Sequence, residues 1–184
     1  MEIYDSAKIG KRIAWGRSHA VYRYGIDEVI KIPRLERWLG TRLEDRLQRD
    51  ISTCREFFGE YFLDTRLVIS PDGKTIAAMQ PAVTGHYLGK ADLADSNIKR
   101  QFDDFVARYE SMIRAGHAPV DLIGQGGVLR RRLSNVLVTE DKRLKLFDAS
   151  LLDTKDIEWG IPLVRLIIWL VLKRQVSTIR YLLS

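Results

Sequence analysis

Residues 135 to 148 read NVLVTEDKRLKLFD, two short apolar runs on either side of a polar turn. Runs of this length, rich in Val and Leu and separated by Glu140-Asp141-Lys142, predict a β-hairpin. The hairpin is flanked by Asn135 and Asp148, so it brings an amide oxygen and a carboxylate close together. Oxygen ligands of this kind suit Mg²⁺. The alternative is that both are ordinary turn residues, a common use of Asn and Asp.

The N-terminal part of the chain also predicts hairpins. Residues 13–24 contain a turn around Gly16 and Ser18, and the turn at residues 25–27 leads into the β-branched run Val29-Ile30-Lys31-Ile32. Backbone N–H groups at such a glycine turn can contact phosphate oxygens. The lysine follows one short hairpin later, which favours phosphate contact for its amine. An ordinary hairpin turn and a solvated lysine on an edge strand are the alternatives.

The segment from Leu35 to Tyr61 is rich in Leu, Glu, Arg and Gln and predicts a helix. Glu56 is the candidate carboxylate for pairing with Lys31, and Glu44 is the alternative. A further hairpin is predicted around the turn Pro71-Asp72-Gly73.

The end of this hairpin and the polar stretch after it predict a connector between two halves of the chain. Residues 81–91 are predicted as the linker. The residues on either side differ in character, since strands dominate before the linker and helices after it.

The second half predicts a helix over residues 98–115, closed by Gly116, because apolar side chains recur at helical spacing. Asp121 follows, 14 residues before Asn135, and is either a functional carboxylate or a helix or turn cap. Three arginines, Arg130 to Arg132, lie between the two. They are suited to clamping an anionic substrate, or they form a solvated basic loop.

Composition and charge limit the classes of function. The chain has 184 residues, 46% hydrophobic and 29% charged, which suits one globular domain or two small lobes. A single cysteine excludes an intrachain disulfide, and three dispersed histidines argue against structural zinc. The net charge of +6 suits a polyanionic partner, but no nucleic-acid-binding motif accompanies it, so no specific nucleic acid is expected.

The run IPLVRLIIWLVL at residues 161–172 is too short to span a bilayer, which needs about 20 residues. A buried C-terminal helix is predicted. The alternative is a helix on an anionic membrane surface, supported by Lys173, Arg174 and Arg180. The N-terminus lacks the features of a signal peptide, so we expect a cytoplasmic protein, with peripheral contact at the inner face of the membrane as the alternative.

Taken in order, Lys31, Glu56, Asp121, Asn135 and Asp148 resemble the functional residues of the protein-kinase-like superfamily. The chain is similar in outline to its compact bacterial branches, including lipopolysaccharide-core kinases and small PhoP-regulon kinase-like proteins. The resemblance implies an α+β, minimal bilobal fold. Residues 1–80 would form an antiparallel-sheet N-lobe with one helix, 81–91 the hinge, and 92–184 a truncated helical C-lobe.

The resemblance also implies ATP and Mg²⁺ as cofactors and phosphoryl transfer to a hydroxyl acceptor, either protein Ser/Thr or a sugar or lipid-linked glycan. Asp121 and Lys31 would be catalytic, and Asn135 and Asp148 would bind the metal. The nucleotide-binding residues would be Gly16, Ser18, Lys31, Glu56, Gln80 and Ala82. Of the glycines in the glycine-rich turn of the family, this chain has only Gly16, and a long insertion follows Asp121. Both departures keep a nucleotide-binding pseudokinase open as the alternative.

Overall fold

A computed structural model describes residues 1–15, 19–33, 43–124, 131–152 and 162–184. The chain divides into two compact units. The N-terminal unit consists of Met1–Ser52 and Leu63–Val83, and the C-terminal unit of Thr53–Phe62 and Thr84–Ser184. Helix α1 therefore contributes residues to both.

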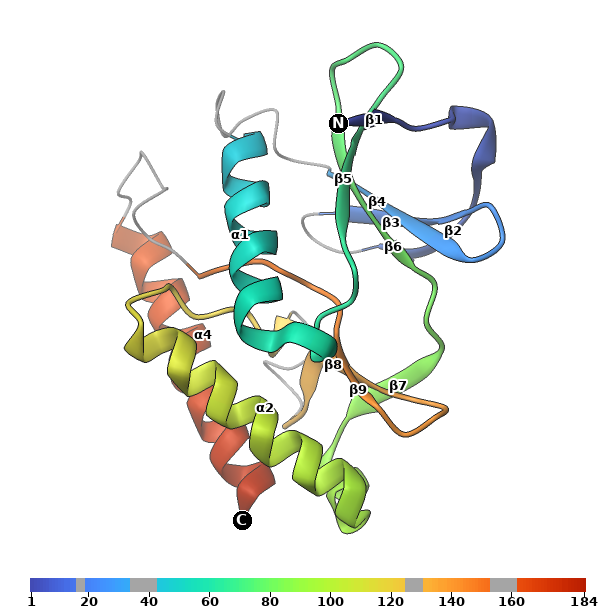
Figure 1. Cartoon of the computed structure of the whole chain (residues 1–184). Coiled ribbons are helices and arrows are strands. Elements are labelled where there is room, and N and C mark those ends of the chain that lie inside the picture. The colour runs from blue at the N-terminus through green and yellow to red at the C-terminus, as the bar shows by residue number, and fades with distance from the viewer. Residues whose placement is uncertain (16–18, 34–42, 125–130, 153–161) are drawn as a thin grey trace. The chain divides into compact units, whose positions relative to one another are not determined.

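A six-stranded sheet with the order β1-β5-β6-β4-β3-β2 forms the N-terminal unit (Figure 1). Its strands are β1 (Glu2–Ile3), β2 (Ile9–Trp15), β3 (His19–Tyr24), β4 (Glu28–Pro33), β5 (Arg66–Ile69) and β6 (Ile76–Pro81), with the short 3-10 helix η1 (Ser6–Lys8) after β1. The sheet is mixed, because β1 pairs in parallel with β5, whereas the other pairings are antiparallel. An entirely antiparallel sheet was the expectation, and β1 corrects it.

The predicted hairpins of this unit are confirmed. Gly25 and Gly73 lie in the β3–β4 and β5–β6 turns with φ of 57° and 70°, a backbone region that glycine enters without steric cost. One face of the sheet carries the core of the unit, in which Ile30 and Val68 are fully buried. The core cluster comprises Tyr4, Tyr24, Ile30, Val68, Ala77 and Met79.

Helix α1 extends over Leu43–Phe58 and continues into the 3-10 helix η3 (Gly59–Tyr61). The first eight residues of the helix predicted from Leu35 lie outside the described residues. At its C-terminal end the ring of Phe58 packs on Phe105 at 4.8 Å between centroids, and Tyr61 meets the same ring edge-on at 5.8 Å. These contacts belong to the core of the C-terminal unit.

The C-terminal unit contains a three-stranded sheet with the order β7-β8-β9, from β7 (Gly85–Leu88), β8 (Leu133–Thr139) and β9 (Leu144–Leu146). The β8–β9 hairpin confirms the prediction made from residues 135–148. Strand β7 corrects the prediction that residues 81–91 are only a linker. A Cβ atom at Gly85 would lie 2.4 Å from the carbonyl oxygen of Val138, so β7 can approach β8 only because residue 85 is glycine.

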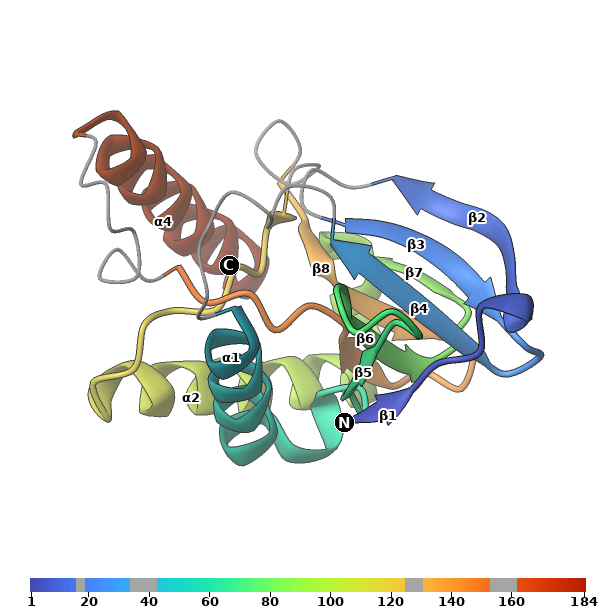
Figure 2. The ribbon, with the colours of Figure 1, turned by 90° about the horizontal axis from the view of Figure 1, so that it is seen from above.

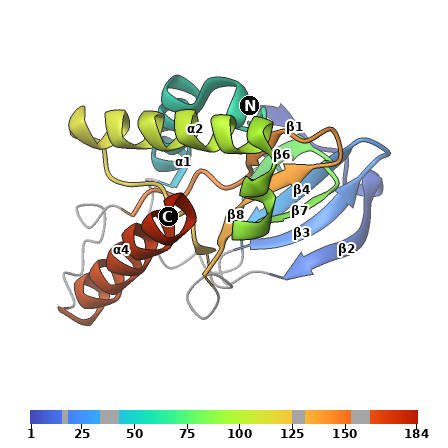
Figure 3. The ribbon, with the colours of Figure 1, turned by 90° about the horizontal axis from the view of Figure 1, so that it is seen from below.

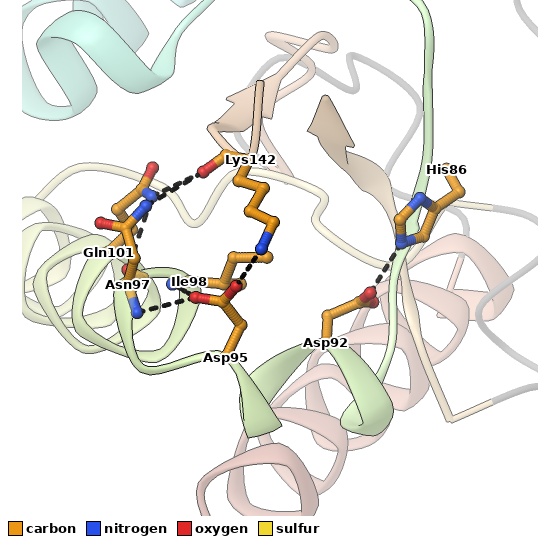
Figure 4. Close-up of polar contacts among 7 residues, drawn as sticks. All are labelled: His86, Asp92, Asp95, Asn97, Ile98, Gln101 and Lys142. Carbon is orange, nitrogen blue, oxygen red and sulfur yellow. Dashed lines mark hydrogen bonds and ion pairs between the residues drawn. The ribbon is translucent and has the colours of Figure 1, made fainter. Parts of the chain in front are cut away.

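Helix α2 (Ser96–Arg114) follows the 3-10 helix η4 (Lys90–Ala94) and confirms the predicted helix. Asp95 caps it by accepting from the N–H of Asn97 at 2.9 Å. Figure 4 shows the polar contacts between the β8–β9 turn and the start of this helix. Lys142 Nζ donates to Asp95 Oδ2 at 2.8 Å, and its carbonyl oxygen accepts from Gln101 Nε2 at 2.9 Å. Beside them His86 Nε2 and Asp92 Oδ1 are 2.6 Å apart.

Helix α4 (Pro162–Leu183) confirms the predicted buried helix only for its C-terminal half, where Gln175, Thr178, Ile179 and Leu182 are buried. In Figures 2 and 3 this half lies near α2, and the N-terminal half projects away from it. Large apolar side chains of that N-terminal half include some that are 40–51% exposed: Leu166, Ile167, Trp169 and Leu170. None of the described helices combines the length with the hydropathy that a membrane-spanning segment needs.

Candidate active site

The segments around Asp121 and Asp148 lie side by side in the C-terminal unit. The N–H of Asp121 donates to the carbonyl oxygen of Ser150 at 2.8 Å, and the N–H of Leu152 donates to the carbonyl oxygen of Pro119 at 2.7 Å. These bonds form a short antiparallel connection between the chain before Asp121 and the chain after Asp148. Both carboxylates therefore belong to one hydrogen-bonded substructure.

Asn135, at the start of β8, links this substructure to the hairpin. Its side-chain Nδ2 donates to the carbonyl oxygen of Asp121 at 2.7 Å, and its backbone N–H donates to the carbonyl oxygen of Leu122 at 3.1 Å. Its own carbonyl oxygen accepts from the N–H of Phe147 at 3.2 Å. Because the NH₂ group is held by Asp121, the orientation of the amide and the direction of Oδ1 are fixed.

Gly124 leaves the space into which this oxygen points. Its φ is 51°, and a Cβ atom there would lie 2.8 Å from Asn135 Oδ1. The turn that places Gly124 is set by Asp121, whose Oδ1 accepts from the N–H groups of Ile123 at 3.1 Å and of Gly124 at 2.9 Å. Gly124 belongs to the insertion that follows Asp121. Its positive φ could not be deduced from the neighbouring residues.

Asp148 is held by the residue two positions after it. Its Oδ1 accepts from the N–H of Ser150 at 3.1 Å and from the Ser150 hydroxyl at 2.8 Å. Ala149 is the residue between Asp148 and Ser150, and its carbonyl oxygen lies 3.8 Å from Sγ of Cys54, the buried thiol of α1. The carboxylate is thus fixed by its own turn.

The two carboxylates influence one another electrostatically. Burial raises the pKa of Asp121, the N–H groups of Gly124 and Ile123 lower it, and the negative charge of Asp148 raises it. The net result is a pKa above the ordinary value for aspartate. A carboxylate with a raised pKa holds a proton more strongly than a solvated one, which suits the role of a base.

The chemistry of the donors bears on metal binding. The described residues contain no group of three or more His, Cys, Asp or Glu side chains that could hold a metal on their own. Mg²⁺ needs fewer protein ligands, because it is commonly bound by one or two carboxylates together with water and phosphate oxygens. The amide oxygen of Asn135 and the carboxylate of Asp148 are oxygen donors that fit this pattern.

Gln175 on α4 is the residue of this site that sequence analysis missed. It is fully buried, and its Oε1 accepts from the N–H of Leu122 at 2.8 Å. Its Nε2 donates to the carbonyl oxygen of Val120 at 2.9 Å and to the hydroxyl of Tyr109 at 2.7 Å. One amide therefore holds the backbone on both sides of Asp121. No local pattern around residue 175 signals this role.

Lys31 lies on β4 in the N-terminal unit, where it is opposite Val21 on β3 and Ala78 on β6. Its side chain is half-buried, whereas its neighbour Ile30 faces the core. Lys31 is thus on the predicted strand. A meeting of its amine with the residues of the C-terminal unit stays a prediction.

The carboxylate partner of Lys31 stays a prediction. Glu56 is exposed and belongs to the C-terminal unit, and the alternative Glu44 is also exposed. The buried carboxylate of α1 is Asp50, which is 5% exposed and lies in the same unit as Lys31. Arg49 Nη2 contacts its Oδ1 at 3.0 Å. Asp50 is therefore a second candidate for the role predicted for Glu56.

Two of the remaining predicted nucleotide-binding residues, Gln80 and Ala82, are among the described residues. Gln80 is buried, and its side chain donates to Thr65 Oγ1 at 2.7 Å inside the N-terminal unit. The N–H of Ala82 donates to the carbonyl oxygen of Asp27 at 2.7 Å, which leaves the carbonyl oxygen of Ala82 as the polar group for a base. The predicted contacts Gly16 and Ser18, together with Arg130, lie outside the described residues.

Comparison with known proteins concerns the fold. No protein-family model matches the chain, and no curated protein matches it. Among solved structures, 176 chains match. One is described as the Legionella pneumophila Lpg2603 kinase bound to IP6, with a TM-score of 0.50 and 16% sequence identity over 87% of this chain. The chain has a protein-kinase-like fold. The match spans 59% of the length of that kinase, so the kinase-like fold, and not the activity, is what the likeness establishes.

Proposed function

We propose that this chain binds Mg·ATP and transfers the γ-phosphoryl group to a hydroxyl acceptor, either a protein Ser/Thr or a sugar or lipid-linked glycan. The observation that carries the proposal is the joining of Asp121, Asn135 and Asp148 in one hydrogen-bonded substructure of the C-terminal unit. Phosphoryl transfer requires positioning and charge stabilisation rather than elaborate covalent chemistry, so an amide and two carboxylates suffice at this side of the site.

Asn135 Oδ1 and the carboxylate of Asp148 would hold the magnesium. The glycine at position 124 keeps the approach to that amide oxygen open, and Ser150 fixes the Asp148 carboxylate. When bound, Mg²⁺ neutralises negative charge on the phosphates. A side chain larger than hydrogen at position 124 would compete for the space beside Asn135 Oδ1.

Asp121 would act as the base. Its carboxylate accepts the proton of the acceptor hydroxyl as the oxygen forms its bond to the γ-phosphorus, and the bond from that phosphorus to the β–γ bridging oxygen breaks to leave ADP. The hydrogen bonds from Ile123 and Gly124 orient the carboxylate for this step. Its raised pKa makes it a better base than a solvated aspartate, provided that the pH lies above that pKa.

Lys31 would contact the α- and β-phosphates, with Asp50 or Glu56 orienting its amine. Gly16 and Ser18 would cover the phosphates, and the carbonyl oxygen of Ala82 would accept from the exocyclic amine of adenine. These roles follow from the kinase-like fold, and each concerns a residue outside the substructure around Asp121.

The test separates binding from chemistry. Mg·ATP should raise the melting temperature of the wild-type chain, and radiolabel from [γ-³²P]ATP should be transferred to the chain or to an added acceptor. Lys31→Ala and Asp148→Ala should each abolish transfer. Lys99→Ala, which removes a cation paired with Asp103 on the exposed side of α2, is the control and should transfer normally.

A second function is binding of nucleotide without transfer, favoured by the long segment of 13 residues between Asp121 and Asn135. Stabilisation by Mg·ATP that is lost in Asp148→Ala, with no transfer in the wild type, would select this function. Transfer that persists unchanged in Asp148→Ala would contradict both.

A further inference from the structure

Three cationic side chains gather next to the candidate active site within the C-terminal unit. Arg132 Cζ lies 4.6 Å from the centroid of the Tyr87 ring. Arg131 Cζ and Lys90 Nζ lie 5.1 Å and 4.7 Å from the centroid of the Tyr181 ring. Aromatic faces attract cations at these distances and restrict where they lie. The three cations are called the cationic cluster below.

The cations of the cationic cluster have no carboxylate partners among the described residues. Among the residues that the structure describes, none of Lys90, Arg131 and Arg132 forms an ion pair with a carboxylate. Lys90 Nζ makes a neutral hydrogen bond of 3.3 Å to Ser184 Oγ. Other cations of the unit do pair with carboxylates, among them Lys99, Arg108, Arg114, Lys142 and Arg143.

Contacts with the residues before Asn135 and Asp148 connect the cationic cluster to the two candidate metal ligands. Arg132 Nε donates to Ser134 Oγ at 3.3 Å, and Ser134 immediately precedes Asn135. On the other side, the Tyr87 ring under Arg132 lies 6.5 Å from the Phe147 ring, and Phe147 immediately precedes Asp148. The cationic cluster therefore flanks the end of the hairpin at which phosphoryl transfer is proposed.

Unpaired cations at such a place favour an anionic ligand. Guanidinium groups bind phosphate and carboxylate through paired N–H donors, and these charge-assisted bonds are about twice as strong as neutral ones. The rings of Tyr87 and Tyr181 hold the cations before any ligand arrives, which reduces the entropy lost on binding. The net charge of +6 attracts anions from a distance as well.

We propose that Lys90, Arg131 and Arg132 bind an anionic group of the acceptor, so that the acceptor carries a phosphate or carboxylate of its own beside the hydroxyl that is phosphorylated. This inference rests on the proposed function, because it identifies the anionic ligand as the phosphoryl acceptor. The anion site itself does not depend on turnover. A sugar phosphate and an acidic peptide share this chemistry, and the experiment distinguishes them.

Binding is measured first, with inorganic pyrophosphate as the probe and the ring resonances of Tyr87 and Tyr181 as the readout. Pyrophosphate should shift both rings in the wild type and in Lys31→Ala. The double variant Arg131→Ala/Arg132→Ala should bind at least about tenfold more weakly. Arg114→Ala, which removes an exposed arginine paired with Glu110, is the control and should bind as the wild type does.

Rings that do not respond to pyrophosphate would overturn the proposal. A response lost in Lys31→Ala but kept in the double variant would also overturn it, because the anion would then be bound elsewhere.

Turnover is measured second, in two arms. One compares hexose 6-phosphates with the parent hexoses, and the other compares a serine peptide flanked by glutamates with the same peptide flanked by glutamines. Preference for the charged member in either arm, with a KM about tenfold higher in the double variant and kcat little changed, supports the proposal and names the source of the anion. Equal use of charged and uncharged members would refute it. Anion binding without transfer in any arm would support the site and count against the phosphotransferase.

Discussion

Replacing Gln175 with leucine should show how much of the candidate active site depends on one buried amide. The substitution keeps the volume but removes three hydrogen bonds of 2.7 to 2.9 Å, to the N–H of Leu122, the carbonyl oxygen of Val120 and the hydroxyl of Tyr109. Leu122 and Val120 are fully buried, and Tyr109 is 4% exposed, so water does not replace the lost partner without rearrangement.

The substitution leaves three buried polar groups unpaired, and each such group destabilises the folded state by about 1–3 kcal/mol. The apolar leucine regains part of that through burial, so we expect Gln175→Leu to lower the free energy of unfolding by about 3–5 kcal/mol. This is a large share of the total of about 5–15 kcal/mol for a typical domain. Gln175→Glu keeps the acceptor for the N–H of Leu122 but sets a buried carboxylate against the carbonyl oxygen of Val120, so it should also be destabilising.

Urea unfolding gives the stability, and hydrogen exchange gives the location of the effect. The amide of Leu122 should lose protection in Gln175→Leu, and phosphoryl transfer should fall with it. Val176→Gln, at a position 41% exposed on the same helix, is the control. It should change the free energy of unfolding by no more than about 0.5 kcal/mol and leave the protection of the Leu122 amide as in the wild type. A Gln175→Leu protein with wild-type stability and an unchanged Leu122 exchange rate would refute the reasoning.

Three further predictions concern single sites. Asp148→Asn should lower the raised pKa of Asp121, because it removes the negative charge that adds to the effect of burial, and an NMR titration of the Asp121 carboxyl that gives an unchanged value would contradict this electrostatic interaction. Since a raised pKa favours the protonated form in the fold, the stability from Asp121 is lost as pH rises through that pKa, and transfer should increase over the same range. Gly124→Ala should weaken Mg²⁺ binding about tenfold or more by displacing Asn135 Oδ1, measured by titration with Mn²⁺ as a paramagnetic substitute, whereas Gly116→Ala should not. Lys142 has φ 56°, so Lys142→Gly should be about 1 kcal/mol more stable to urea than Lys142→Ala, although both lose the contact with Asp95, and equal stability would argue against the strained backbone.

Sequence patterns predicted the elements that are formed by neighbouring residues. The hairpin from Asn135 to Asp148 and the helix closed by Gly116 follow from alternation, helical spacing and glycine turns, and both are present. Strand β7 was missed because its side chains are polar or exposed, and its strand conformation comes from pairing with β8. Strand β1 is only two residues long, too short to carry a pattern.

The residues of the candidate site also differ in whether the sequence could predict them. Asp121, Asn135 and Asp148 were found because kinase-like chains carry them in that order, and their joining in one substructure supports the prediction. Helix α1 offers several carboxylates, and helical periodicity alone does not show that Asp50 is buried while Glu56 is exposed. Burial is decided by what the helix packs against, and that information is not local.

The bond between Leu122 and Gln175 has a consequence for the order of events on the ribosome. The two residues are 53 positions apart. At a synthesis rate of about 5–20 residues per second, the segment around Asp121 is made roughly 3–10 s before the amide that holds it. During that interval its backbone N–H and carbonyl groups must stay solvated or find temporary partners. A nascent chain arrested before α4 emerges should therefore present this segment to proteases, whereas the released chain should protect it.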